Sequence, residues 1–187
     1  PALPKTGTMN FDQVEGFPPI EQNDVQILIL GSAPSVESLK QQQYYAHPRN
    51  SFWPIITTLL TGESQQLSYP ERTELLKQHQ VALWDVMKSC ERPGSLDSAI
   101  TAESIEANNF EQFFSNHPQI NALFFNGSKA EETYRKQVLP NLPSLYTAIP
   151  QHRLPSTSPA MAMLNREQKL EQWRVILEYV YIHPPRK

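Results

Sequence analysis

Three short apolar runs, each followed at once by polar turn residues, constrain the fold of this chain more than any other feature. They are VQILIL at 25–30, VALWDV at 81–86 and ALFF at 122–125. Apolar runs of this length without polar alternation are typical of strands buried on both faces of a sheet. A fourth segment, LYTAIPQHRL at 145–154, is interrupted by Pro150, and we expect it to form an edge or bent strand.

Segments with helical periodicity alternate with these strands, at 52–60, 71–79, 104–115, 129–138 and 166–181. Strands joined by crossovers of this length run parallel with right-handed connections. The sequence therefore predicts an α/β fold, a three-layer α/β/α sandwich around a central four-stranded, mainly parallel sheet. Residues 1–24 are rich in proline and polar residues, which predicts an extended arm lying over a single domain of residues 25–187.

The composition excludes several classes of protein. A single cysteine, Cys90, cannot form an internal disulfide or a four-cysteine metal site, which favours a cytoplasmic protein. No apolar run is long enough to cross a bilayer, and the N-terminal residues do not have the layout of a secretion signal, so we expect no membrane partner. The formal net charge of −3 at pH 7 argues against a broad basic surface, so a DNA-binding protein of this kind would need a local patch.

Ligands of open α/β sheets bind outside the carboxyl ends of the strands, which makes four loops candidates: 31–50, 85–98, 126–130 and 155–162. The GSAPS turn at 31–35 can present backbone N–H groups to an anion. It is neither a GxGxxG nor a Walker loop, so it does not support a nucleotide cofactor. No G-x-S-x-G occurs, which argues against a serine hydrolase. The PSTSPA loop at 155–160 suits phosphate contacts and a solvated turn about equally.

Taken together, six strings resemble one family. GFPPI, ILGSAPS, QQQYYAHPRNSFWPI, ALWDVMKSCERPGSLDSAI, FFNGSKAEE and LPSTSPA occur between residues 16 and 173. Their order and spacing are similar to those of the hypoxanthine-DNA glycosylases, a branch of the uracil-DNA glycosylase superfamily. The long YYAHPRNSFW and SCERPGSLDS strings are the specific part of this resemblance.

The resemblance implies the fold of that superfamily and a monofunctional DNA glycosylase of base-excision repair. Such an enzyme would hydrolyse the N-glycosidic bond of deoxyinosine and leave an abasic site, after extruding the base from the stack. It implies DNA with a damaged base as the partner, no metal and no cofactor. We expect a monomer inside a bacterial-type cell, at the nucleoid because its substrate is there.

Two positions depart from the pattern of better-known relatives. Ala33 stands where those relatives orient the water with Asp or Asn, and Leu154 stands where they carry a catalytic His or Asn. The alternatives are therefore excision of uracil or another damaged base, and a lesion-binding module without activity. We favour a relocated catalytic group, which the resemblance implies is Asn50. Its amide would orient water and lie near the developing positive charge. The alternative role for Asn50 is to cap the following helix.

The resemblance also implies a base pocket. Ser35 replaces a bulky aromatic of the uracil-specific relatives and leaves room, Phe52 would stack on the base, and Tyr44 or Tyr45 would close the pocket. For these aromatic residues core packing is the alternative. Gly31 to Trp53 as a whole would form the main wall, with Ser32, Ala33 and Ser35 at its beginning.

Hypoxanthine presents an N–H donor beside a carbonyl acceptor, so its reader should offer an acceptor and a donor. Asn126 is our first candidate and Asp85 the second. Asn126 can instead begin a turn, and Asp85 can instead pair with Arg92 or Lys88. The residues expected to hold DNA phosphates are Lys129, Ser156, Thr157 and Ser158, with Met161 as a wedge and with Lys88, Arg92 and Arg153 adding positive charge.

Overall fold

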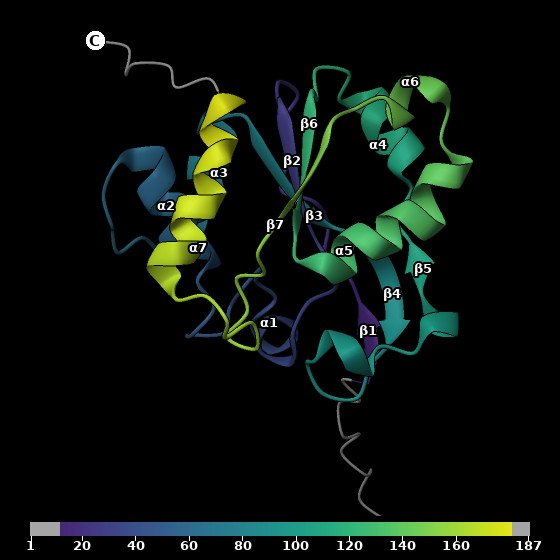
Figure 1. The fold of residues 1–187 in the computed structure, drawn as a ribbon, viewed down its shortest axis with the longest axis horizontal. Coiled ribbons are helices and arrows are strands. Elements are labelled where there is room, and N and C mark those ends of the chain that lie inside the picture. The colour runs from purple at the N-terminus through teal and green to yellow at the C-terminus, as the bar shows by residue number, and fades with distance from the viewer. Residues whose placement is uncertain (1–11, 181–187) are drawn as a thin grey trace, which may run out of the picture.

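The computed structural model describes residues 12–180 (Figure 1). Its strands are β1 (Gln13–Glu15), β2 (Ile27–Gly31), β3 (Val81–Asp85), β4 (Met87–Glu91), β5 (Glu106–Ala107), β6 (Ala122–Asn126) and β7 (Gln151–Leu154). Its α-helices are α1 (Val36–Gln41), α2 (Phe52–Thr61), α3 (Tyr69–Gln78), α4 (Phe110–Asn116), α5 (Ser128–Thr133), α6 (Ser144–Thr147) and α7 (Arg166–Trp173). Tyr134–Val138 extend α5 as a π-helical turn, and Arg174–Glu178 extend α7 as a 3-10 helix.

The central sheet has four strands in the order β3-β2-β6-β7, and every neighbouring pair is parallel. The predicted α/β fold with a four-stranded sheet is therefore confirmed, and the sheet is wholly parallel. Gly31 pairs in register with Asp85, and Asn126 pairs with Leu154. The carboxyl ends of all four strands consequently lie at one edge of the sheet, where their loops can meet.

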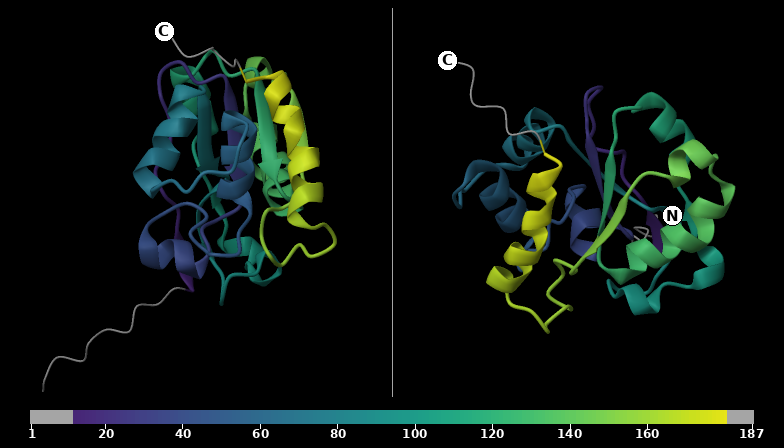
Figure 2. Two further views of the ribbon diagram at one scale, coloured as in Figure 1. Left: turned by 90° about the vertical axis from the view of Figure 1, so that its left-hand side faces the viewer. Right: turned by 45° about the horizontal axis from the view of Figure 1, so that its top comes forward.

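Helices cover both faces of this sheet (Figures 1 and 2). Helices α2, α3 and α7 lie on one face, where Ile27, Ile29 and Phe124 belong to the apolar core with residues of those helices. Helices α4 and α5 lie on the other face, over Leu28, Leu30 and their neighbours. Because successive strand residues point to opposite faces, a continuous apolar run such as that of β2 fills both cores.

A second, smaller sheet was not predicted from the sequence. Its strand order is β1-β4-β5, with antiparallel pairing, and β4 follows β3 after one residue. Val14 and Cys90 pair across it and are both buried. The buried residues of β4, Met87 and Cys90, are three apart, and its pairing with β5 shifts register, so this strand lacks the two-residue alternation by which a one-sided strand is found in a sequence.

Two predicted elements were wrong in part. The helix predicted at 104–115 begins at Phe110, because residues 106–107 pair with β4 and the Asn108 N–H donates to the Val86 carbonyl. The strand predicted at 145–154 begins at Gln151, after α6 and Pro150. In both places a short helix and a short strand lie within one predicted segment, and each is too short to show its own period in the sequence.

Residues 12–24, part of the predicted arm, run along the domain and contribute β1. Ile20 forms an isolated antiparallel bridge with Leu83 and lies in the core cluster of α2, α3 and α7. Residues 1–11 of that arm lie outside the described residues, as does Tyr181, the last residue of the predicted C-terminal helix. Within residues 12–180, no helix combines the length and apolar character that crossing a membrane requires.

Candidate active site

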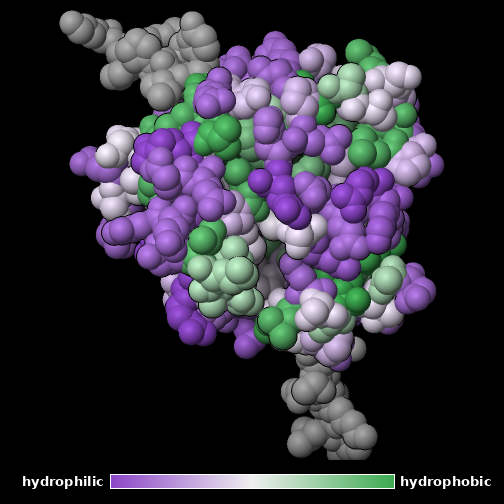
Figure 3. Space-filling view, viewed as in Figure 1, coloured by the Kyte–Doolittle hydropathy of each residue, from purple (hydrophilic) through white to green (hydrophobic). Residues whose placement is uncertain are grey.

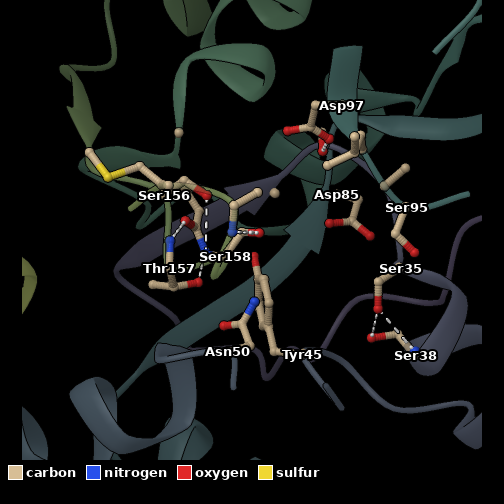
Figure 4. A pocket seen from close by; sticks show the side chains of 18 of the residues that line it. Ser35, Ser38, Tyr45, Asn50, Asp85, Ser95, Asp97, Ser156, Thr157 and Ser158 are labelled. Atoms are coloured by element: carbon tan, nitrogen blue, oxygen red, sulfur yellow. Dashed lines mark hydrogen bonds between the residues drawn. The ribbon is translucent and has the colours of Figure 1, made fainter. Parts of the chain in front are cut away.

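A pocket of about 470 Å³ opens at the carboxyl ends of the parallel strands. All four loops predicted at this edge contribute to its lining, and Figure 4 shows the side chains of most of the lining residues. The predicted site residues that line it are Ser32, Ala33, Ser35, Asn50, Asp85, Asn126, Ser156, Thr157, Ser158 and Met161. Convergence of loops far apart in the chain follows from the common strand direction.

Gly31 forms the floor of this pocket at the end of β2. A Cβ atom at this position would lie 2.5 Å from Asp85 Oδ1 and 2.7 Å from the Tyr45 hydroxyl. Both distances are shorter than carbon and oxygen atoms tolerate, so two polar side chains lie against the bare Gly31 backbone. The glycine therefore provides space for a donor and an acceptor side by side.

Asp85 is 3% exposed, and its Oδ2 atom has no hydrogen-bond partner. Burial, together with the nearby Asp97 charge and against the opposing Arg92 charge, raises the pKa of the Asp85 carboxyl to about 7. A carboxyl group with this pKa can change its charge near neutral pH. A buried carboxyl group in a pocket, with a shifted pKa and an oxygen that has no hydrogen-bond partner, is typical of a functional site.

Of the two alternatives for closing the pocket, Tyr44 and Tyr45, it is Tyr45 that lines the pocket. Tyr45 has a left-handed backbone conformation, with φ at 53°, and its buried hydroxyl lies beside the Asn126 side chain without a well-formed hydrogen bond. Tyr44 donates its hydroxyl to the Pro18 carbonyl at 2.8 Å and lies in the core. The left-handed backbone separates the directions of the two neighbouring rings, which the adjacent letters of the sequence do not reveal.

Phe52 was predicted to stack on the base, but it is fully buried and does not line the pocket. It stacks instead on the Tyr45 ring, with 4.3 Å between the ring centroids and 29° between their planes. Trp173 packs on Phe52 edge to face. Phe52 therefore supports the Tyr45 ring, which lines the pocket in its place.

Asn50 lines the pocket and also makes the helix-capping contact that we considered as its alternative role. Its side-chain oxygen accepts the Phe52 N–H at 2.9 Å, at the beginning of α2. An amide oxygen has two lone pairs, so this bond leaves one of them and the amide N–H groups for a ligand. Capping and ligand contact are therefore compatible at this residue. Asn50 and Tyr45 are both among the lining residues labelled in Figure 4.

Asn126, our first candidate for reading the base, is mainly engaged with Thr157. Its amide donates to the Thr157 hydroxyl at 2.9 Å, and its carbonyl oxygen accepts the Thr157 N–H at 2.9 Å. Both residues are buried. This reciprocal pair joins the end of β6 to the serine-rich loop, residues 155–160. It uses half of the hydrogen-bonding capacity of the Asn126 amide.

Side chains of helix α7 donate hydrogen bonds to the serine-rich loop. Trp173 donates its ring N–H to the Pro155 carbonyl at 2.9 Å, and the buried Lys169 ammonium donates to the Ser158 carbonyl at 3.1 Å. The Ser51 N–H donates to the Thr157 carbonyl at 3.0 Å. The loop is thus attached both to α7 and to the residue that follows Asn50.

The basic residues predicted to add positive charge are largely engaged elsewhere. Arg92 is 1% exposed and donates to the carbonyls of Pro34 and Gly94. Lys88 lies 3.5 Å from Glu106, and Arg153 lies 3.8 Å from Glu131. Lys129 is half-buried and follows the exposed pocket residue Ser128, but does not itself line the pocket.

Several lining residues were not predicted as site residues. They are Ser38, which was included only in the range 31–53, and Ser95, Leu96, Asp97, Ser98, Gly127, Ser128 and Ala160. Residues 95–98 belong to the SCERPGSLDS string, which was the available signal for them. The Ser32 hydroxyl donates to Asp97 at 2.7 Å, and this bond connects the first two loops. Among residues 12–180, no group of three His, Cys, Asp or Glu side chains is placed to hold a metal ion.

Comparisons with known proteins agree with this arrangement. Residues 18–180 match the model of the uracil DNA glycosylase superfamily. A protein of Methanosarcina barkeri named hypoxanthine DNA glycosylase is 38% identical over 118 residues, which cover 63% of this chain and 73% of that protein. A protein of Methanosarcina acetivorans with the same name is 38% identical over 134 residues, which cover 67% and 84%.

A solved structure is also similar. It is the solution NMR structure of a Methanosarcina acetivorans protein described as a candidate uracil DNA glycosylase. The two chains are 36% identical and superpose with a TM-score of 0.71. The match covers 89% of this chain and 99% of that one.

Proposed function

The chain belongs to the uracil DNA glycosylase superfamily, and from this premise we propose that it excises hypoxanthine from deoxyinosine in DNA. Two relatives that are 38% identical carry the name hypoxanthine DNA glycosylase, which supports this substrate. The reaction is hydrolysis of the N-glycosidic bond, in which water adds to C1′ of the sugar and the base leaves. The proposal includes a monomer that acts on chromosomal DNA in the cytoplasm.

The observation that carries the proposal is the pair of unpartnered polar groups at Gly31. The Tyr45 hydroxyl can donate to the O6 carbonyl of hypoxanthine, and the Asp85 carboxylate can accept from its N1–H. Adenine presents a lone pair at N1, which would face the lone pairs of the Asp85 carboxylate, and an amino group at C6, to which the Tyr45 hydroxyl cannot donate. A site built to pair with a base edge rejects an analogue that leaves buried polar groups unpaired.

This assignment changes the order of our two candidate readers. The Asn126 amide is held by Thr157 on both its donor and its acceptor side, whereas Asp85 Oδ2 has no partner. A buried polar atom without a partner costs free energy unless a ligand satisfies it. We therefore assign the reading to Asp85 with Tyr45, and to Asn126 the positioning of the serine-rich loop.

The chemical step is assigned to Asn50. The sugar passes through an oxocarbenium-like state, as in other glycoside hydrolyses. The second lone pair of the Asn50 oxygen can orient the attacking water and lie near the positive charge at C1′. Because the Phe52 N–H fixes the Asn50 side chain, the amide is held in place before the substrate binds. This preorganisation compensates for the absence of a polar side chain at Ala33.

The test is a set of duplexes that differ only at one nucleotide: deoxyinosine, deoxyuridine or deoxyadenosine. Base release is followed by alkaline cleavage of the abasic strand on a gel. We expect multiple turnovers on deoxyinosine and none on deoxyadenosine. Cleavage of the deoxyuridine duplex alone would preserve the reaction class and contradict the substrate.

A second candidate is a lesion-binding module without activity. The observation that favours it is that Ala33 lines the pocket without a polar group and Leu154 is buried in the core. Tight binding of deoxyinosine duplex with no base release at enzyme in excess over DNA would support this candidate.

A further inference from the structure

Leu96 lies at the rim of the pocket with 56% of its surface exposed. Among the described residues, the other large hydrophobic side chains with comparable exposure are Leu145 and Met163. Figure 3 shows that hydrophobic residues on the face it presents occur in small groups among hydrophilic ones. One exposed leucine is unremarkable by itself, so the argument depends on how this one is held.

The backbone on both sides of Leu96 is anchored to the first loop. The Ser95 hydroxyl accepts the Val36 N–H at 2.9 Å, and the Asp97 carboxylate accepts the Ser32 hydroxyl at 2.7 Å. Arg92, buried a few residues earlier, donates to the Pro34 carbonyl. With its two neighbours fixed by side-chain bonds, Leu96 is held at the rim and does not reach the core.

The loops that carry Leu96 and Met161 lie on opposite sides of the pocket, because they follow the two outer strands of the sheet. The loop that carries Leu96 follows β3 and β4, and β3 is one edge strand of the order β3-β2-β6-β7. The loop that carries Met161 follows β7, the other edge strand. The pocket mouth therefore has an apolar side chain on each side, with polar groups between them.

We propose that Leu96 inserts into the base stack of duplex DNA beside the extruded nucleotide, from the side of the pocket opposite Met161. This inference rests on the proposed function. An extruded base leaves a gap in the stack, and apolar side chains fill such gaps in other proteins that deform DNA. The partner is duplex DNA, because a single strand presents no continuous stack that must be held open.

The test compares Leu96→Ala with Leu145→Ala, a matched change at an exposed leucine of α6 outside the pocket. Both act on one deoxyinosine oligonucleotide, presented as a single strand and as a duplex. We expect Leu96→Ala to lower kcat/KM about tenfold on the duplex and less than about twofold on the single strand. Leu145→Ala should change neither, and Leu96→Phe should retain the duplex activity.

A loss of equal size on both substrates, or no loss on either, would overturn the proposal. Thermal unfolding of Leu96→Ala should match that of the natural sequence, because the side chain is exposed. Insertion is also measured without turnover. A 2-aminopurine placed next to the deoxyinosine brightens when its stacking is broken, and Leu96→Ala should brighten it less than the natural protein. If the natural protein brightens the probe but releases no base, the proposed function fails and the insertion stands.

Discussion

The chemistry that we propose for the pocket depends on three residues, Asn50, Asp85 and Tyr45. Each one combines a structural contact with an unused polar group. Asn50 caps α2 and retains a lone pair, Tyr45 stacks on Phe52 with a free hydroxyl, and Asp85 ends β3 with a free oxygen. For a single residue, the structural contact and the proposed chemical role are separated by measuring stability and activity on the same variants.

Asn50→Asp retains a good helix-capping side chain, whereas Asn50→Ala removes it. We expect Asn50→Ala to lose about 1 kcal/mol of unfolding free energy and Asn50→Asp to lose little. Asn50→Ala should lose at least about a hundredfold in kcat on deoxyinosine duplex if the side-chain oxygen orients the water, whereas Asn50→Asp keeps an oxygen acceptor and should lose less. Urea unfolding and single-turnover kinetics measure the two effects. Normal kcat in Asn50→Ala would leave capping as the role of Asn50.

The pKa of Asp85, raised from its model-peptide value of 3.8 to about 7, predicts the pH dependence of stability. The folded protein binds the proton more tightly than the unfolded chain, so this carboxyl lowers stability as pH rises from about 4 to about 7, and no further above 7. The full effect is at most about 4 kcal/mol. Asp85→Asn should therefore raise Tm at pH 8 more than at pH 5. An equal change at both pH values would contradict the raised pKa.

The same group predicts a pH dependence of activity. An ionised carboxylate accepts a stronger hydrogen bond than a neutral group. We expect kcat/KM for deoxyinosine duplex to rise between pH 6 and pH 8, and to be nearly flat over that range in Asp85→Asn. Asp85→Leu, which offers no acceptor, should be inactive at every pH. A variant Asp85→Asn with the natural pH profile would show that another group titrates.

At the scale of elements, α7 is the support of the serine-rich loop. Arg166, Lys169 and Trp173 lie on one face of it, three and four residues apart, and each donates a hydrogen bond to Ser51 or to the loop. The capping box of Asn165 and Gln168 fixes where this helix begins. The position of the loop thus depends on a helix that does not itself line the pocket.

Lys169 permits a test of this support. Its ammonium is 4% exposed, has no ion pair among the described residues, and its pKa is lowered by burial. Lys169→Met removes a buried charge and the bond to the Ser158 carbonyl. We expect Tm not to fall, while KM for DNA rises about tenfold. Lys136→Met, at an exposed residue paired with Glu132, is the control. An unchanged KM in Lys169→Met would exclude this support.

At the scale of the whole molecule, charge sets the DNA affinity. The net charge is −3, and Lys88, Arg92 and Arg153 are paired or buried. We expect the affinity for DNA to fall only gently with salt, with a slope of log K against log[salt] corresponding to about three phosphate contacts or fewer. Fluorescence anisotropy at salt concentrations from about 50 to about 200 mM measures this slope. Lys129→Ala should reduce the slope by about 1, and Lys136→Ala should not.

The sequence by itself determined which segments form the buried strands and which loops carry the site. Continuous apolar runs can be satisfied only by a sheet covered on both faces, and parallel strands bring their carboxyl ends to one edge. The loops at Gly31, Asp85, Asn126 and Pro155 follow directly from this rule. The small sheet of β1, β4 and β5 did not follow, because its strands are too short to show a period.

Only the tertiary structure decided which polar groups face the pocket. Tyr44 and Tyr45 are chemically identical neighbours, and the left-handed backbone at Tyr45 selects between them. The choice of Asp85 over Asn126 depends on Thr157, 31 residues beyond Asn126, which uses the Asn126 amide. Hydrogen-bond satisfaction is a property of the folded neighbourhood, so local sequence cannot supply it. The sequence therefore determines which loops carry the site, and the fold determines how those loops form the pocket.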